Sequence, residues 1–246
     1  MHSIKIGSVN VGSGPVKVLV SLSSKEERSL SSRARTLDKE PVDILEWRLD
    51  AFKTYDVDSL SHAYDRLRIS TTKPILCTLR TSREGGVAAL DRKAYKKLLL
   101  SFMGRTKPDA IDIEFGRGDV KELFSFAKEC SIPIVSSFHD FEKTPKETVL
   151  FQKLSRMYAA GADILKIAVM PKSERDVLTV FSTLLRAKEA FASPIIAIAM
   201  GPLGILTRVA GGAFGSAATF AGFGSTSAPG QLNLEETRAL LLSLNR

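Results

Sequence analysis

Short apolar runs alternate with longer segments of mixed polarity along almost the whole chain. Each run is rich in branched residues and has the length of a buried strand, whereas the segments between the runs repeat apolar positions at helical spacing. The predicted strands cover residues 16–22, 43–49, 74–79, 110–114, 132–138, 164–169, 194–199 and 213–220. The first predicted helix begins at residues 24–27. The other predicted helices cover residues 58–69, 91–103, 119–129, 145–160, 173–190, 203–209 and 234–244.

Residues that flank these segments support the predicted boundaries. Ser24, Ser173 and Asn233 stand where the N-caps of three helices are expected, and Gly161 stands where a helix would end in a left-handed residue. A weaker alternation over residues 4–11 precedes the turn sequence Gly12-Ser13-Gly14-Pro15, which predicts a β-hairpin or arm before the main fold.

Strict alternation of strand and helix indicates a parallel sheet. Eight strand–helix pairs, with no linker or shift in composition between them, favour one (β/α)8 barrel domain over residues 1–246 rather than an open doubly wound sheet. The active site of such a barrel lies at the carboxyl ends of the strands. We therefore searched the predicted strand ends for polar side chains.

The middle of the strand at residues 164–169 contains a lysine, Lys166. Burial disfavours the charged form of a lysine, and a neutral amine attacks carbonyl groups to form Schiff bases. The alternative at this stage is a lysine near the strand end that extends its amine to solvent.

Other predicted strand ends also carry ionisable groups. Alternation places Glu46 and Arg48 on one face of the strand at residues 43–49. It likewise places Asp112 and Glu114 on one face of the strand at residues 110–114. Arg80 and His139 end two further strands. His139 lies on the strand before that of Lys166, and its imidazole suits proton transfer near neutral pH.

Two basic residues complete this predicted set. Arg208, in the short segment 203–209, is suited to hold a substrate carboxylate by two parallel hydrogen bonds. Arg48 is expected near Lys166, where its charge would favour the neutral amine. The Gly-rich segment 222–231 is interpreted as a lid or a loop that contacts the ligand.

Composition narrows the choice of partners. The net charge of +8 at pH 7 favours anions. The chain has no run of five basic residues, no aromatic RNA-binding signature and no zinc-finger spacing, so we expect a small acidic substrate and no nucleic acid. No apolar segment is long enough to span a bilayer, and no partnership with a membrane is expected.

Expectations about cofactor and cellular compartment rest on sequence motifs that we did not find. His2, His62 and His139 have no ligand spacing, so no metal is expected. Gly222-Phe223-Gly224 lacks the third glycine of a dinucleotide fingerprint, and no cofactor is expected. Cys77 and Cys130 lie in unrelated segments, which suits a reducing cytosol, and no signal peptide is evident, so a cytoplasmic location is expected.

Seven segments that contain or adjoin these polar residues also match a known family in order. They are Glu46-Trp47-Arg48-Leu49-Asp50, Arg80-Thr81-Ser82-Arg83-Glu84-Gly85-Gly86, Ser136-Ser137-Phe138-His139-Asp140-Phe141, Leu165-Lys166-Ile167-Ala168, Arg208-Val209-Ala210-Gly211, Phe214-Gly215-Ser216-Ala217-Ala218-Thr219-Phe220 and Ser227-Ala228-Pro229-Gly230-Gln231. From about residue 16 to its end, the chain resembles the type I 3-dehydroquinate dehydratases.

This resemblance implies a homodimeric (β/α)8 enzyme of the shikimate pathway that converts 3-dehydroquinate to 3-dehydroshikimate and water. It implies that Lys166 forms the Schiff base and that His139 is the general acid and base. The substrate-binding positions that it implies are Ser21, Glu46, Arg48, Arg80, Met200, Arg208, Ser227, Ala228 and Gln231. Glu84, Asp112 and Glu114 are expected to support them. Ile198 departs from the methionine common at its position, which predicts altered packing around the substrate ring.

Two other functions remain open at this stage. A Schiff-base aldolase that acts on a sugar phosphate would use the same lysine and would bind phosphate near the last two strands. A non-catalytic protein that binds nucleic acid or other anions would use the net positive charge.

Overall fold

Eight parallel strands form the centre of the molecule. The computed structural model describes residues 2–117, 120–224 and 228–244. The strands are β1 (Ile4–Ile6), β2 (Val9–Val11), β3 (Lys17–Leu22), β4 (Ile44–Arg48), β5 (Ile75–Thr78), β6 (Ala110–Glu114), β7 (Ile134–Asp140), β8 (Ile164–Val169), β9 (Ile195–Ala199) and β10 (Ala218–Ala221). The helices are α1 (Glu27–Asp38), α2 (Val57–Arg68), α3 (Arg92–Thr106), α4 (Lys121–Glu129), α5 (Glu147–Ala159), α6 (Glu174–Ala190), α7 (Ile205–Val209) and α8 (Leu234–Leu244).

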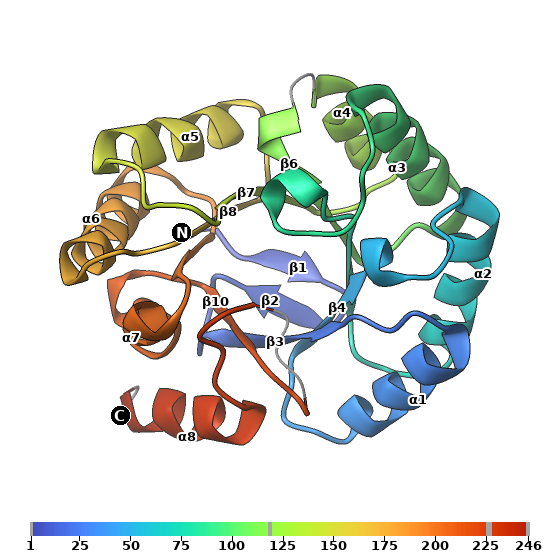
Figure 1. Cartoon of the computed structure of the whole chain (residues 1–246), viewed down its shortest axis with the longest axis horizontal. Helices are drawn as coiled ribbons and strands as arrows, with labels where there is room; N and C mark the ends of the chain where they lie inside the picture. The colour runs from blue at the N-terminus through green and yellow to red at the C-terminus, as the bar shows by residue number, and fades with distance from the viewer. Residues whose placement is uncertain (1, 118–119, 225–227, 245–246) are drawn as a thin grey trace.

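The parallel sheet curls into a barrel, and the helices surround it (Figure 1). Its strand order is β10-β3-β4-β5-β6-β7-β8-β9. The two edge strands approach each other just before β10, where the N–H of Ala217 donates to the carbonyl of Ile195 over 2.7 Å. The predicted (β/α)8 barrel is confirmed.

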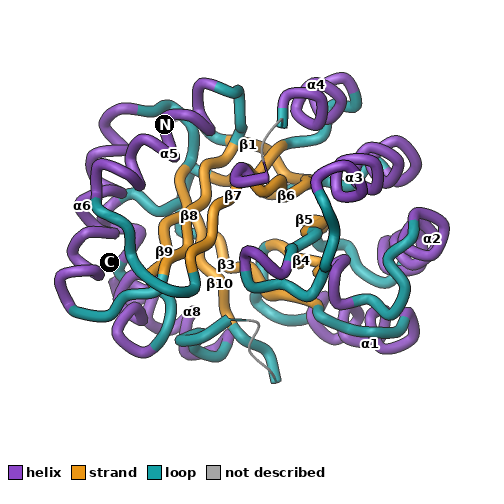
Figure 2. The backbone as a smooth tube through the Cα atoms, turned by 45° about the horizontal axis from the view of Figure 1, so that its top comes forward, coloured by secondary structure: helices purple, strands orange, loops and turns teal. Residues whose placement is uncertain are grey.

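Alternating side chains along each strand divide the core into two layers. On β4, Leu45 and Trp47 point outward and pack against the helices. Ile44 points inward and belongs to a second apolar cluster inside the barrel. The polar residue Glu46 shares the inward face with Ile44. Because this alternation decides which side chains enter the barrel, it also positions the polar groups described below. Figure 2 shows the barrel strands with the helices around them.

The predicted N-terminal hairpin is confirmed as β1 and β2, which pair antiparallel. Ile6 and Val11 pack into the apolar cluster inside the barrel. Gly7 and Gly12 approach Pro74 and Pro194, which stand directly before β5 and β9. The hairpin therefore covers the end of the barrel where the strands begin, and the opposite end remains for the polar side chains.

Several predicted boundaries are confirmed. Ser173 forms a capping box with Asp176, the side chain of Asn233 accepts the N–H of Glu236, and Gly161 follows α5 with φ +87°. Ser24 as a cap is wrong, because α1 begins at Glu27 after Glu26.

The last predicted strand, at residues 213–220, begins too early. Residues Gly211–Phe214 form a 3-10 turn, and β10 covers only Ala218–Ala221. Gly215 adopts φ +107° and separates the two, so the small-residue run is not extended throughout.

Helices of the described part give no candidate for a membrane span: none is both long enough and apolar enough.

Candidate active site

Lys166 lies inside the barrel on β8, with 4% of its surface exposed. Its Nζ lies 3.3 Å from Oδ2 of Asp112 on β6 and 3.7 Å from Oε1 of Glu46 on β4. The ring of Phe220, on β10, faces the same atom with its centroid 4.4 Å away. The alternative in which this lysine extends to solvent is therefore wrong, and its amine stands between two carboxylates and an aromatic face.

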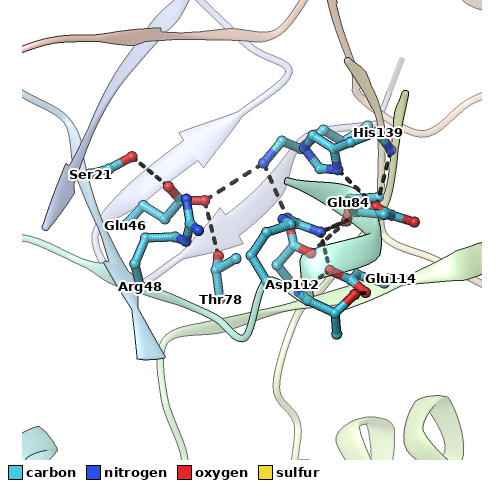
Figure 3. Close-up of polar contacts among 12 residues, drawn as sticks. Ser21, Glu46, Arg48, Thr78, Glu84, Asp112, Glu114 and His139 are labelled. Atoms are coloured by element: carbon cyan, nitrogen blue, oxygen red, sulfur yellow. Dashed lines mark hydrogen bonds and ion pairs between the residues drawn. The ribbon is translucent and has the colours of Figure 1, made fainter. Parts of the chain in front are cut away.

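His139 stands beside this lysine on the neighbouring strand. Ser137 pairs with Lys166 in the register of β7 and β8, so His139, two residues further on, lies on the same face and nearer the strand ends. Its Nδ1 lies 2.9 Å from Oε2 of Glu84, and the same oxygen accepts the backbone N–H of His139 over 3.1 Å (Figure 3). The imidazole is therefore fixed by one carboxyl group from the segment after β5.

Burial shifts the pKa values of both members of this pair toward their neutral forms. The pKa of His139 falls well below its ordinary value because the ring is desolvated and because Arg80, Lys166 and Arg48 are close. Burial raises the pKa of Glu84 to about 8; Glu114 and Asp112 add to the rise, while Arg80 opposes it. Near neutral pH the pair therefore holds an uncharged imidazole.

Arg80 connects the acids beneath the pair. Its Nη2 lies 2.9 Å from Oδ2 of Asp112, and its Nη1 lies 3.1 Å from Oε1 of Glu114. Its Nη1 also donates to Oγ of Ser137, which donates in turn to Asp112 over 2.6 Å. Burial would raise the pKa of Asp112, but Arg80 and Lys166 hold it below its ordinary value.

Glu46 and Arg48 have separate partners although they share one face of β4. Oγ of Ser21 donates to Oε2 of Glu46 over 2.5 Å, and Oγ1 of Thr78 donates to Oε1 over 3.0 Å. The guanidinium of Arg48 binds Asp50 through Nε and Nη2, over 2.8 and 2.7 Å. Arg48 is thus held by a carboxylate of its own, Asp50. The effect of Arg48 on the protonation of Lys166 stays a prediction.

Arg208, on α7, is buried without an acidic partner within 4 Å among the described residues. Its Nη1 and Nη2 donate to the carbonyls of Phe220 and Pro229 over 3.4 and 2.9 Å. Its Nε has no hydrogen-bond partner among the residues that the structure describes, and burial lowers the pKa of Arg208 to about 10. A buried guanidinium with an unused donor is suited to receive a ligand carboxylate.

These groups surround one cavity of about 510 Å³ that is partly open to solvent. The lining contains the expected residues Glu46, Arg48, Arg80, Glu84, His139, Lys166, Met200, Arg208, Ala228 and Gln231, together with Gly85, Phe141, Ala168, Ile198 and Phe220.

Three expected residues stand behind this lining rather than in it. Ser21 donates a hydrogen bond to Glu46, and Asp112 and Glu114 both contact Arg80. Ser227 lies outside the described residues.

Among the residues that sequence reasoning missed, two contact charged side chains of this site. Asp50 binds Arg48, and it was quoted only as part of a matching segment. Phe220 faces Lys166, and the alternation along its strand could have placed it inside the barrel. Within the described ranges, no group of three or more His, Cys, Asp or Glu side chains is arranged to hold a metal ion.

Comparison with known proteins decides the family. The family model described as type I 3-dehydroquinase matches residues 18–246. The chain belongs to the type I 3-dehydroquinase family. Proteins of this family named 3-dehydroquinate dehydratase, from Escherichia coli O17:K52:H18 (strain UMN026 / ExPEC) and Salmonella agona (strain SL483), are each 38% identical to it over 251 aligned residues, which cover 100% of both chains.

Solved structures of type I 3-dehydroquinases agree with this assignment. The type I 3-dehydroquinate dehydratase of Clostridium difficile, solved with covalently modified comenic acid, has a TM-score of 0.95 at 33% identity, covering 99% of this chain and 98% of that one. The 3-dehydroquinate dehydratase of Geobacillus kaustophilus HTA426 also has a TM-score of 0.95, at 34% identity, covering 99% of this chain and 96% of that one.

Proposed function

We propose that this type I 3-dehydroquinase converts 3-dehydroquinate to 3-dehydroshikimate and water in the shikimate pathway, as one catalytic domain over residues 1–246. The observation that carries the proposal is the buried amine of Lys166 in a cavity that is also lined by His139 and by Arg208, which has no acidic partner within 4 Å among the described residues. A lysine of this kind is suited to imine formation, and the arginine to a carboxylate. The modified comenic acid in the Clostridium difficile relative is consistent with covalent chemistry in this family.

Arg208 binds the substrate carboxylate in this proposal. Ala228 and Gln231 also line the cavity, and Pro229, between them in the chain, accepts a hydrogen bond from Arg208. Ser227, outside the described residues, belongs to the same segment of the chain. Glu46, Arg48 and Arg80, with Ser21 behind Glu46, bind the ring hydroxyls and the imine. The side chains of Met200 and Ile198 pack against the apolar part of the ring.

The reaction begins when the neutral amine of Lys166 attacks the C3 ketone. The carbinolamine loses water and becomes an iminium ion, which withdraws electrons and acidifies the C2 proton. His139, uncharged because of its lowered pKa, removes that proton. The enamine then expels the C1 hydroxyl, to which His139 returns the proton. Water hydrolyses the imine and releases the enone product.

Glu84, Asp112 and Glu114 support these steps without contacting the reacting carbons. Glu84 orients the imidazole through Nδ1, and Asp112 lies 3.3 Å from the amine that must lose a proton before it attacks. Glu114 holds Arg80 and Thr81, which begin the segment that carries Glu84.

Product formation from 3-dehydroquinate tests the proposed reaction directly. The conjugated enone absorbs in the ultraviolet, so turnover can be followed continuously without a coupling enzyme. We expect turnover without added metal or cofactor. An enzyme that leaves 3-dehydroquinate unconsumed but acts on a sugar phosphate would favour the Schiff-base aldolase instead.

We also propose that the enzyme is a cytoplasmic homodimer that does not bind nucleic acid. Leu178 and Leu185 on α6 and Leu206 on α7 are strongly exposed, and α6 lies against α7. Exposed apolar side chains gathered in this way suit a protein interface. Sedimentation should give a dimer that Leu206→Lys weakens; a monomeric wild-type chain would contradict this part of the proposal.

A further inference from the structure

Asp50 accepts four hydrogen bonds although it contacts no part of the cavity. It follows β4 in the short 3-10 helix Leu49–Ala51, and only 2% of its surface is exposed. Nε of Arg48 and the backbone N–H of Arg80 donate to Oδ1 over 2.8 and 3.2 Å. Nη2 of Arg48 and the backbone N–H of Val87 donate to Oδ2 over 2.7 and 3.1 Å. Each oxygen thus accepts one arginine bond and one backbone bond.

The two backbone bonds lie at the two ends of the segment that carries Glu84. Residues 81–88 leave β5 and fold back, so that the N–H of Ser82 donates to the carbonyl of Ala88 over 3.0 Å. Gly86 makes this close approach possible, since a Cβ there would lie 2.0 Å from the carbonyl oxygen of Arg80. Asp50 joins the start and the end of this segment to β4.

Glu84, inside this segment, is the residue that contacts His139 through both Nδ1 and the backbone N–H. Arg48, the other partner of Asp50, lines the cavity directly. One carboxylate outside the cavity is therefore bonded to a ligand-facing guanidinium and to the backbone that positions the partner of the histidine.

We propose that Asp50 is a positioning residue that holds Arg48 toward the substrate and Glu84 against His139 at the same time. The inference rests on the proposed function, because it assigns the residue a part in that same reaction. Asp50 touches neither the substrate nor the reacting groups. It acts through the geometry of the two side chains that it connects.

An asparagine at this position is a severe change although its shape is nearly the same. Because donors face both carboxylate oxygens, the NH2 group of an asparagine would meet an arginine N–H and a backbone N–H in either orientation. One of the two bonded groups must therefore move. An error of about 1 Å in the placement of catalytic groups can cost about 100-fold in rate.

Asp109 offers a matched control at the opposite end of the barrel. It stands directly before β6, and its Oδ2 accepts Nη1 of Arg68 over 2.7 Å and the N–H of Ile75 over 2.8 Å. Like Asp50, it binds one arginine side chain and accepts a backbone N–H from another segment of the chain, although Asp50 accepts two such N–H groups. A general loss of stability would therefore affect Asp109→Ala as well as Asp50→Ala.

The experiment compares kcat, KM, the pH profile of kcat/KM and the melting temperature of wild type, Asp50→Ala, Asp50→Asn and Asp109→Ala. For Asp50→Asn we expect kcat to fall about 100-fold and KM to rise about tenfold as Arg48 loses its partner. The ionisation of the Glu84–His139 pair should move to lower pH, because a loosened segment admits water to Glu84. Asp109→Ala should keep the wild-type kinetics and profile despite a lower melting temperature.

A second substitution separates charge from position. Asp50→Glu keeps the negative charge but moves it by one methylene, so Arg48 keeps a partner while the bond to Val87 is displaced. We expect KM to recover more than kcat, and this variant replaces Asp50→Asn if the latter does not fold.

Wild-type kinetics in folded Asp50→Asn, or changes no larger than those of Asp109→Ala, would overturn the inference. Absence of turnover in the wild-type chain would instead overturn the proposed function.

Discussion

Arg208→Met should uncouple substrate binding from stability, because the free protein buries this guanidinium at a cost. Burial lowers the pKa of Arg208 to about 10, well below the ordinary range of a guanidinium. A lowered pKa in a base means that the folded protein binds the proton less tightly than the unfolded chain does. At pH values below about 10, the charged side chain therefore destabilises the fold, by about 3 kcal/mol.

Methionine removes that cost and also removes two hydrogen bonds. The bonds to the carbonyls of Phe220 and Pro229 stabilise the fold by about 1 kcal/mol each. The remaining balance is about +1 kcal/mol in favour of the variant, so its melting temperature should rise by about 2–4 °C. A thermal unfolding curve of the free protein measures this change.

Substrate affinity should change in the opposite direction. A buried charge pair between Arg208 and a substrate carboxylate contributes about 2–5 kcal/mol, so kcat/KM should fall by at least about 30-fold, mostly through KM. The increase in melting temperature that ligand produces in the wild-type enzyme should be largely lost.

Arg117→Met provides the control for this prediction. Arg117 is also buried and donates to the carbonyl of Leu90, and its Nε has no partner within the described ranges, but it does not line the cavity. Its substitution should leave KM unchanged. An unchanged KM in Arg208→Met would refute the assignment of the carboxylate, and a melting temperature several degrees below wild type would refute the estimate of its cost.

Three further predictions concern the proposed reacting groups. Lys166→Met should abolish turnover while the chain stays folded, as steady-state assay and circular dichroism would show; residual turnover near wild type would exclude the lysine. His139→Ala should still form an imine with 3-dehydroquinate but eliminate water slowly. Borohydride should therefore trap an adduct of substrate mass in this variant under conditions in which the wild-type enzyme forms product. Because the pKa of Glu84 is about 8, the Glu84–His139 pair loses its extra proton as pH rises through that value, and kcat/KM should rise with it. Glu84→Gln should move this rise below pH 6.5, the ordinary value for histidine, because the pKa of His139 is lowered; an unmoved profile would contradict the pairing.

The barrel and the inward position of several site residues could be predicted because they follow from local periodicity. Alternation along β4 and β6 separates Glu46 and Asp112 from outward-facing neighbours such as Trp47, and the structure confirms this separation. An apolar strand with one cation at its centre left two possibilities for Lys166, burial or extension to solvent, and the structure confirms burial. Each of these predictions needed only residues near one another in the chain.

The partners of these side chains could not be predicted, because they come from distant strands and irregular segments. The approach of Glu46 and Asp112 to the amine of Lys166 depends on strands on different sides of the barrel. The partner of Arg48 was not predicted either, because the 3-10 helix after β4 brings Asp50 back to its guanidinium. No periodic pattern describes such a turn.

The segment that leads into β10 shows a different limit of prediction from sequence. A run of small residues at 213–220 was predicted as one strand, yet the backbone of Gly215 is left-handed and only Ala218–Ala221 is extended. Glycine adopts extended and left-handed backbone conformations at little cost, so a glycine in the sequence does not indicate which of the two the tertiary packing selects.

The measurement that tests the account most directly is the intact mass of the enzyme after incubation with 3-dehydroquinate and borohydride. Reduction converts an imine to a stable secondary amine, so one adduct of substrate or product mass should appear and should map by peptide sequencing to Lys166. Lys166→Met, treated in the same way, should stay at its unmodified mass. An unmodified wild-type enzyme with 3-dehydroquinate unconsumed, or an adduct mapped to another lysine, would contradict the proposed mechanism.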